Sequence, residues 1–540
     1  MGNVRSQQKF ATGLAGTAMA GGLLLSGAAM AQIVPDATLG NEASTVTTDS
    51  PIRGANGDLI EGGALRGDDL FHSFEDFNVN DLQRVYFANP AAIDSIFSRV
   101  TGNNISEILG TLGVDGDADL YFLNPNGVVF GENAQLDIAG SLFVSTADGF
   151  DWGEGLVYSA TDPNAPPLLA VSLTPGLQLS ATQRAIENSG SLSVGEDLTL
   201  VSGELTLTGE LLAGETLSLL ATDTLEIRDS QTQPFIASAG NSLLVEGNNL
   251  IDIFALSHPD SGLFSGADMV LRSDNTVIGD AHYFSGGSFR IEQLDGSAGD
   301  RAGPNDPVIL TVGDVGIGDY QDGASLHVLA GGSIILGNVV INQTGSVDDT
   351  IGPNSSNPLF QALSTVTLSD GSTAVIDGAT RPTLDVRAGV DWSQFPGFPG
   401  GSLETPPGSV GPIFNPTPNG SLILIGNVDA RRENAAAFEN SNIFITNQFN
   451  RNAALPTDAV TSSVSIGNIN ASTGQEQTTE IVQAGDVVID SFGNVSTRNI
   501  STFVDGDSEG IAGSIVIRSE TGPIDTTAAG DPTEGTLISS

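Results

Sequence analysis

The chain has 540 residues and a formal net charge of −47, from 65 acidic and 18 basic residues. Such a polyanion repels nucleic acid and anionic membrane surfaces, so neither is expected as a partner. The sequence contains no cysteine, which excludes disulfides, thiol catalysis and cysteine-ligated metal sites.

The first 31 residues have the pattern of a signal peptide. Arg5 and Lys9 supply a positive start, and an apolar stretch rich in Ala, Gly and Leu leads to an Ala-x-Ala site that ends at Ala31. A membrane anchor is the alternative, but the apolar run is short, glycine-rich and followed by no positive cluster. We therefore expect export and cleavage between Ala31 and Gln32, and no other segment approaches membrane-spanning length.

A short repeat dominates the rest of the sequence. Gly195-Glu-Asp-Leu-Thr-Leu200 returns 19 residues later as Gly214-Glu-Thr-Leu-Ser-Leu219. Related units of glycine, a polar residue and an alternating apolar run begin at Gly190, Gly323, Gly332, Gly420, Gly485 and Gly513. Each run can form one flat side of a coil of about 20 residues. The pattern predicts an all-β fold, a right-handed parallel β-helix in which apolar side chains stack inside.

A β-sandwich is the alternative fold, because it also has short strands and closely spaced turns. The recurring unit here is one strand rather than a hairpin, which favours the solenoid. Two segments interrupt the pattern and are expected to be loops, the Pro- and Gly-rich residues 391–420 and the stretch from Thr344 to Pro358. The pattern stops at Ser540 without a polar cap, so we expect a longer protein.

From Leu70 to Ala147 the sequence closely resembles the N-terminal secretion domain of filamentous-haemagglutinin-like exoproteins of two-partner secretion systems. The matching motifs are Phe71-His-Ser-Phe-Glu-Asp-Phe-Asn78, Val85-Tyr-Phe87, Asn89-Pro90, Ser98-Arg-Val-Thr-Gly102, Ile108-Leu-Gly-Thr-Leu-Gly113, Leu120-Tyr-Phe-Leu-Asn-Pro-Asn-Gly-Val-Val-Phe-Gly131, Asn133-Ala134 and Leu136 to Ala147. Several motifs in the family's order make the resemblance specific.

The resemblance implies a β-helix whose first coils carry an N-terminal cap. It also implies passage through the general secretion machinery and the periplasm of a Gram-negative bacterium to the cell surface or the medium. The expected partner is an outer-membrane β-barrel transporter with periplasmic recognition domains. On this basis the chain divides into a signal peptide (1–31), a two-partner secretion domain (32–160), β-helix repeats (161–390), a Pro- and Gly-rich loop (391–420) and further, incomplete repeats (421–540).

Within that domain, Asn124, Pro125, Asn126 and Gly127 fit the family's Asn-Pro-Asn-Gly-Ile motif, with valine in place of isoleucine. The resemblance assigns them to contact with the transporter. The same four residues are also expected to form a tight corner between two strands, because Asn-Pro opens a turn and Asn-Gly closes it. The family's second tetrapeptide, Asn-Pro-Asn-Leu, has no clean copy, and Asn89-Pro-Ala-Ala92 is the nearest.

No catalytic residues are predicted. The four histidines, His72, His258, His282 and His327, are far apart and show no metal-binding spacing. Acidic pairs such as Asp115/Asp117 and Asp505/Asp507 are typical of solvated corners in so acidic a chain, although a β-helix could use such pairs to cleave glycans. No cofactor or metal is expected; calcium is the one ion left open, at Asp115-Gly-Asp117 with Asp119 and at Asp505-Gly-Asp507 with Glu509.

Two functions remain open at this point. The first is a non-enzymatic surface or matrix adhesin, with host or cell-surface glycans as possible ligands. The second is an N-terminal carrier of a secreted effector, or a glycan-active β-helix protein. Aromatic residues are few and scattered, which favours the first.

Overall fold

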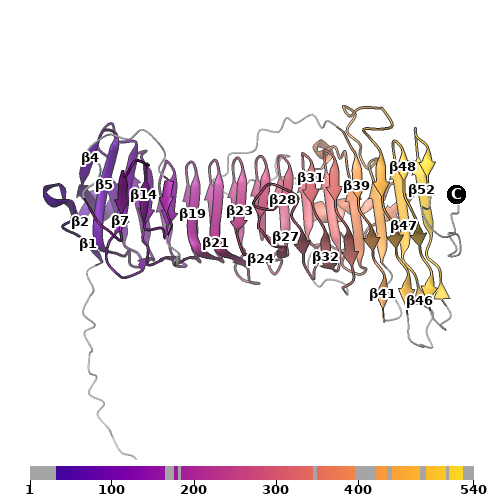
Figure 1. The fold of residues 1–540 in the computed structure, drawn as a ribbon, viewed down its shortest axis with the longest axis horizontal. Coiled ribbons are helices and arrows are strands. Elements are labelled where there is room, and N and C mark those ends of the chain that lie inside the picture. Colours follow the sequence, from indigo (N-terminus) through magenta and orange to yellow (C-terminus); the bar gives the residue numbers. More distant parts are fainter. Residues whose placement is uncertain are drawn as a thin grey trace, which may run out of the picture.

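The computed structural model describes residues 32–164, 176–179, 184–343, 350–395, 420–433, 441–474, 482–505 and 510–526. They form a long shaft of stacked coils with a cap at the N-terminal end (Figure 1). Nearly all the main strands belong to one 43-stranded sheet, and neighbouring coils pair in parallel. The predicted fold, an all-β right-handed parallel β-helix with a capped secretion domain, is confirmed. The signal peptide, including Ala31, lies outside the described residues.

Each coil contributes one strand to each of three faces. The first face consists of β5 (Asp69–Phe77), β7 (Ser95–Val100), β10 (Asp119–Leu123), β13 (Leu142–Ser145), the first halves of β19 (Leu198–Leu207) and β21 (Leu217–Arg228), β23 (Leu243–Gly247), β26 (Met269–Arg272), β28 (Phe289–Glu292), β31 (Val315–Ile317), β34 (Ile334–Leu336), β39 (Ile423–Ile425), β43 (Val464–Ile466), β48 (Val495–Ser496) and β53 (Ile524–Asp525).

The second face begins after the first corner of each coil. It consists of β8 (Ser106–Ile108), β11 (Val128–Phe130), β17 (Ala185–Asn188), the second halves of β19 and β21, β24 (Leu250–Ala255), the first half of β27 (Val277–Ser285), β29 (Arg301–Ala302), β32 (Tyr320–Gly323), β35 (Val339–Ile341), β40 (Val428–Asp429), β44 (Ile469–Asn470) and β49 (Ile500–Ser501).

The third face closes each coil. It consists of β3 (Ala55–Gly62), β6 (Arg84–Ala88), β9 (Thr111–Asp115), β12 (Gln135–Asp137), β18 (Ser191–Val194), β20 (Glu210–Ala213), β22 (Ile236–Ala239), β25 (Gly262–Ser265), the second half of β27, β30 (Val308–Thr311), β33 (Leu326–Ala330), β38 (Thr383–Arg387), β42 (Asn442–Thr446), β47 (Asp486–Ser491) and β52 (Ile515–Ser519). Two small parallel ribbons form separate sheets near the C-terminal end, β41 (Arg432–Glu433) with β45 (Thr473–Gly474) and β50 (Val504–Asp505), and β46 (Val482–Gln483) with β51 (Gly510–Ile511).

The 19-residue repeat seen in the sequence is one full coil. Leu198 of β19 pairs in register with Leu217 of β21, and both side chains are buried in the interior. The repeat glycines stand where coils approach most closely, since a Cβ on Gly214 would overlap the carbonyl oxygen of Gly195 in the preceding coil. Glycine is therefore required at this corner for packing, and the apolar alternation supplies the continuous core.

Polar side chains at one corner form a ladder along the shaft. Oδ1 of Asp319 accepts a hydrogen bond from the backbone N–H of Asn338 at 2.7 Å, and Oδ1 of Asn338 accepts one from Asn427 at 3.0 Å. Asn427 repeats the contact with Asn468 at 3.0 Å. Each rung satisfies a backbone donor that the turn leaves unpaired, so the corner residues hold the coils in register.

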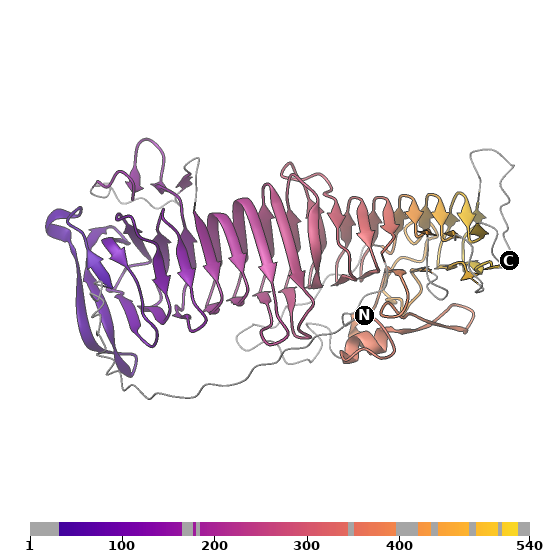
Figure 2. The ribbon, with the colours of Figure 1, turned by 90° about the horizontal axis from the view of Figure 1, so that it is seen from below.

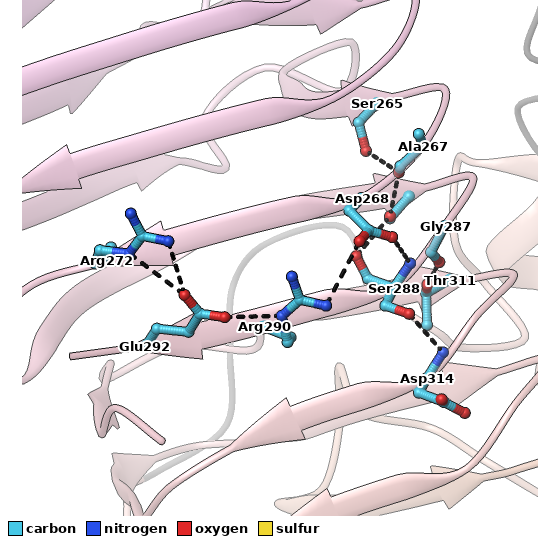
Figure 3. A network of polar contacts seen from close by, with 11 residues as sticks. Ser265, Ala267, Asp268, Arg272, Gly287, Ser288, Arg290, Glu292, Thr311 and Asp314 are labelled. Carbon is cyan, nitrogen blue, oxygen red and sulfur yellow. Dashed lines mark hydrogen bonds and ion pairs between the residues drawn. The ribbon is translucent and has the colours of Figure 1, made fainter. Parts of the chain in front are cut away.

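Charged side chains occupy the outer side of the first face further along. Figure 3 shows Glu292 between Arg272 and Arg290, with Arg290 also reaching Asp268. The N–O distances are 2.9 Å, 2.8 Å and 3.5 Å in that order. These pairs are partly exposed, and pairs of that kind contribute little to stability.

The cap closes the N-terminal end of the interior. β1 (Ile33–Pro35) and β4 (Ala64–Arg66) pair antiparallel with β5, and β2 (Ser44–Ile52) pairs antiparallel with β3. A 3-10 turn, η1 (Gly40–Glu42), joins β1 to β2. A separate three-stranded antiparallel sheet, β15 (Val157–Ser159), β14 (Gly149–Asp151) and β16 (Gly176–Gln178), covers the outer side of the first face and packs Phe150 and Tyr158 against Phe71 and Phe97.

An insertion between β35 and β39 covers part of the third face and is visible beside the shaft in Figure 2. It consists of α1 (Pro358–Leu363) and the hairpin of β36 (Thr365–Thr367) and β37 (Thr373–Val375), which precede the shaft strand β38, and of η2 (Trp392–Gln394), which follows it. Phe360, Trp392 and Phe395 pack on Leu329 and Phe444 in a second core outside the helix. Residues 391–395 are thus packed rather than looped out, and residues 396–419 lie outside the described residues. None of the helices in the described ranges has the length and hydropathy needed to cross a membrane.

Candidate functional site

The Asn124–Gly127 corner joins β10 on the first face to β11 on the second. The Gly127 N–H donates to the carbonyl oxygen of Asn124 at 3.1 Å, which closes a four-residue turn. Gly127 has φ +120°, a conformation that residues with a side chain rarely adopt. The turn predicted from the sequence is confirmed. Its last residue is glycine because the backbone there has a positive φ.

Asn124 is the centre of the corner. Its side chain is fully buried, and its amide nitrogen Nδ2 donates to Asn104 O at 3.0 Å and to Ser106 Oγ at 2.9 Å. Its Oδ1 accepts from the Asn126 backbone N–H at 2.9 Å. Asn124 therefore binds the preceding coil on one side and its own turn on the other, which a residue without an amide cannot do.

Asn126 and Pro125 are the accessible part of the corner, since both are partly exposed while Asn124 and Gly127 are buried. Asn126 Nδ2 donates to Gly102 O at 2.9 Å, so its amide is partly committed to the preceding coil. Pro125 is partly exposed, and its side chain has no group that can form a hydrogen bond within the corner. Of the four predicted contact residues, these two alone present surface to a folded partner.

The second Asn-Pro turn lies at a different corner of the shaft. Asn89 follows β6 on the third face, and its Nδ2 donates to Ile93 O at 2.9 Å. Pro90, Ala91 and Ala92 are exposed, and Ala92 has φ +71°. The two Asn-Pro turns therefore form separate surfaces rather than one.

Sequence reasoning did not identify Arg99 as a key residue, although its motif was recognised. Arg99 on β7 is 0% exposed and links the first coils to the outer sheet. Its Nε donates to Ser73 Oγ at 3.0 Å, and Nη1 donates to Ser159 O at 2.6 Å. Its guanidinium carbon lies 4.0 Å from the ring centroid of Tyr158. The signal in the sequence was a single charged residue within the short strand Ser95-Ile-Phe-Ser-Arg-Val100.

Two further polar groups belong to this junction. Asp36 accepts hydrogen bonds from Thr101 Oγ1 at 2.6 Å and Ser73 Oγ at 2.7 Å; burial raises its pKa, but hydrogen bonds from Thr101, Thr38 and Ser73 outweigh burial and lower it overall. His72 is fully buried beside Ser44, with Nδ1 3.0 Å from Ser44 Oγ, and burial lowers its pKa to about 3. His72 is thus a neutral core residue.

The other sequence candidates are dispersed. His282 and His327 are buried on the third-face side, and His258 is partly exposed near the outer end of β24. Within the described ranges, no group of three or more His, Cys, Asp or Glu side chains is arranged to hold a metal ion. Asp115 lies 3.6 Å from Arg53, and Asp507 and Glu509 lie outside the described residues.

Comparison with known proteins places the capped coils in a family. Residues 31–291 match the model of the TPS secretion domain, the secretion domain of two-partner secretion systems. Over 78 residues the chain is 38% identical to a heme/hemopexin-binding protein of Haemophilus influenzae, and over 75 residues it is 33% identical to a second protein of that description. Each match covers 14% of this chain and 8% of the relative, so the chain matches only a small part of either relative's length.

Two solved secretion domains are among the structures that resemble this chain. The HMW1 secretion domain of Haemophilus influenzae is 12% identical, with 89% of this chain and 97% of that chain covered and a TM-score of 0.31. The filamentous hemagglutinin secretion domain is 15% identical, with 58% and 92% covered and a TM-score of 0.25.

The described residues are therefore those of an exported β-helical protein whose first coils form a capped secretion domain. Residues 31–291 match the TPS secretion domain, and this match supports an exoprotein of a two-partner secretion system. The chain is exported across the outer membrane to the cell surface or the extracellular space, and its secretion domain implies a cognate outer-membrane transporter.

Proposed function

We propose that this chain is a non-enzymatic surface or matrix adhesin whose secretion domain is recognised by a β-barrel transporter at the Asn124–Gly127 corner. The proposed recognition step rests on one observation, the different exposure of the residues at this corner. Asn124 is buried and shapes the turn, whereas Pro125 and Asn126 are exposed enough for the transporter's periplasmic domains to touch. The buried pair presents the exposed pair in one fixed geometry.

The β-helix supports a transport mechanism that needs no nucleotide hydrolysis. Each strand of the shaft pairs only with the coils before and after it, as with β20 between β18 and β22. A chain that crosses the barrel extended can therefore fold outside one coil at a time. Each new coil buries apolar surface worth about 25 cal/mol per Å² and completes backbone pairs with the previous coil.

Substitutions of Pro125 and of Asn124 can distinguish an effect on recognition by the transporter from an effect on folding. Pro125→Ala is expected to lower the amount of secreted protein several-fold while leaving the melting temperature of the purified chain unchanged. Asn124→Ala is expected to lower the melting temperature as well. It removes the hydrogen bonds that the Asn124 amide donates to Asn104 O and Ser106 Oγ, and leaving such buried acceptors unpaired costs about 1–3 kcal/mol. Secretion is measured by immunoblot of culture medium and periplasm, with and without the transporter gene.

Pro90→Ala provides the matched control, since Pro90 sits in the other Asn-Pro turn and is exposed. It is expected to leave secretion and melting temperature unchanged. If the Pro125→Ala variant were secreted as fully as the wild type, Pro125 would not contribute to recognition by the transporter, and the corner would have a structural role alone. Unchanged appearance of the wild-type chain outside cells that lack the transporter would contradict the transport step itself.

The adhesin role is supported by the shape of the product, a long shaft of stacked coils (Figure 1). Cells that lack the chain are expected to attach several-fold less to a glycan-coated or host-cell surface. Adding the purified chain to the medium should restore attachment if the surface-bound shaft is sufficient. Attachment that is the same with and without the chain would contradict this role.

A further inference from the structure

Aromatic residues that are scattered in the sequence gather on the outer side of the first face, which corrects that part of the sequence analysis, and four of their rings form a column. Phe71, Phe97, Tyr121 and Phe143 stand in register on β5, β7, β10 and β13. Successive ring centroids are 5.1 Å, 4.5 Å and 5.7 Å apart. The next position in register, on β19, is Thr199. The column therefore ends at Phe143, above a residue that has no ring to continue it.

A cavity of about 320 Å³ opens at this end. Its aromatic wall consists of Tyr121 and Phe143, with Phe150 of the outer sheet alongside, and Thr199 forms part of its floor. Asp119 and Asp197 line its polar side. A volume of this size matches small-ligand sites, and the aromatic wall suits a flat group stacked at the end of the column.

The charge of the cavity is negative and uncompensated. Asp119 Oδ1 accepts a hydrogen bond from the Ser141 backbone N–H at 2.7 Å, and Asp197 Oδ1 accepts one from Thr216 N–H at 2.8 Å. The second oxygen of each carboxylate has no hydrogen-bond partner among the described residues. No arginine or lysine from the described ranges lines the cavity. The two carboxylates therefore favour a cationic ligand with several N–H donors.

We propose that this cavity binds the guanidinium group of an arginine side chain presented by a partner protein. A guanidinium is flat, keeps its charge, stacks on aromatic rings and donates in a fork that matches carboxylate oxygens. A phosphate or carboxylate ligand would be repelled. A neutral sugar could stack on the rings and donate hydroxyl hydrogen bonds to the carboxylates, but it lacks the positive charge that a guanidinium adds. The site is distinct from the Asn124–Gly127 corner, so it stands whether or not that corner contacts the transporter.

Isothermal titration of the purified exported chain with N-acetyl-arginine amide at low ionic strength tests this directly. We expect one saturable site whose affinity falls as salt is added. The citrulline analogue, which keeps the shape but loses the charge, is expected to bind at least about tenfold more weakly. A methyl pyranoside is expected to show no saturable binding.

Two variants locate the site. Asp119→Asn/Asp197→Asn keeps the backbone contacts and removes both charges, and Thr199→Phe fills the end of the column; each is expected to weaken binding at least about tenfold. The control is Asp314→Asn/Asp486→Asn, because those carboxylates accept the Ser333 and Ser514 N–H groups in the same way, each at 2.7 Å, away from the cavity. Absence of saturable binding, equal binding of citrulline or pyranoside, or unchanged affinity in both cavity variants would overturn the proposal.

Discussion

Replacement of Arg99 by methionine is expected to lower the free energy of unfolding of the capped coils by about 3–5 kcal/mol. Arg99 is 0% exposed and donates to Ser73 Oγ, Thr38 Oγ1 and the Ser159 carbonyl. Methionine fills a similar volume but leaves these acceptors unpaired away from water. Denaturant unfolding followed by fluorescence of Trp152, which packs against Phe97 in the same junction, reports the loss.

The matched control is Arg290→Met. Arg290 makes ion pairs with Glu292 and Asp268, but its side chain is 43% exposed (Figure 3). Removal of such a pair is expected to change stability by less than about 1 kcal/mol. If Arg99→Met were as mild as Arg290→Met, the buried arginine would not be what holds the outer sheet to the first coils.

Acid is expected to destabilise the cap through His72. Burial lowers the pKa of His72 to about 3 from its ordinary 6.5, so the unfolded chain binds a proton before the folded chain does. Stability is therefore fully present above about pH 6.5 and is lost as the pH falls toward 3. The loss is on the order of 3–5 kcal/mol over that window. His72→Gln is expected to flatten this part of the pH profile.

A neighbouring carboxyl group works in the opposite direction. Burial, together with the charge of Asp68, raises the pKa of Asp69 to about 6, so the folded chain binds this proton first and gains stability as the pH falls below 6. The difference between wild type and His72→Gln isolates the histidine, because Asp69 is present in both. His258→Gln, a change at a partly exposed histidine, should retain the wild-type profile. A profile of His72→Gln that parallels wild type would contradict the assignment.

The shaft could be predicted from the sequence because its determinants are local and repeated. Gly195 and Gly214 recur with the leucines that follow them, and one coil length is enough to reveal the period. The same holds for the Asn124–Gly127 turn, whose geometry depends on four adjacent residues. Its contact with the transporter stays a prediction.

What sequence reasoning missed depends on contacts across long separations. Arg99 is buried because Ser159, 60 residues away, supplies a carbonyl to its guanidinium. Likewise, Trp392 and Phe395 stand at the edge of a Pro- and Gly-rich segment, yet they pack in a core built on the outer side of the third face. No local repeat in the sequence marks either set of contacts. For residues 391–420, the Pro- and Gly-rich composition therefore predicted a loop.

The direction of the backbone hydrogen bonds gives the shaft a particular response to force. Strands lie across the shaft, so the bonds between coils run along it, and an end-to-end pull stretches them in tension, one rung after another. A tethered molecule under flow would yield by peeling off single coils rather than by rupturing all at once. Each released coil of 19 residues, such as Leu198 to Thr216, would lengthen the chain by about 65 Å. In a tethered molecule, this stepwise extension would limit the peak force at the attachment points.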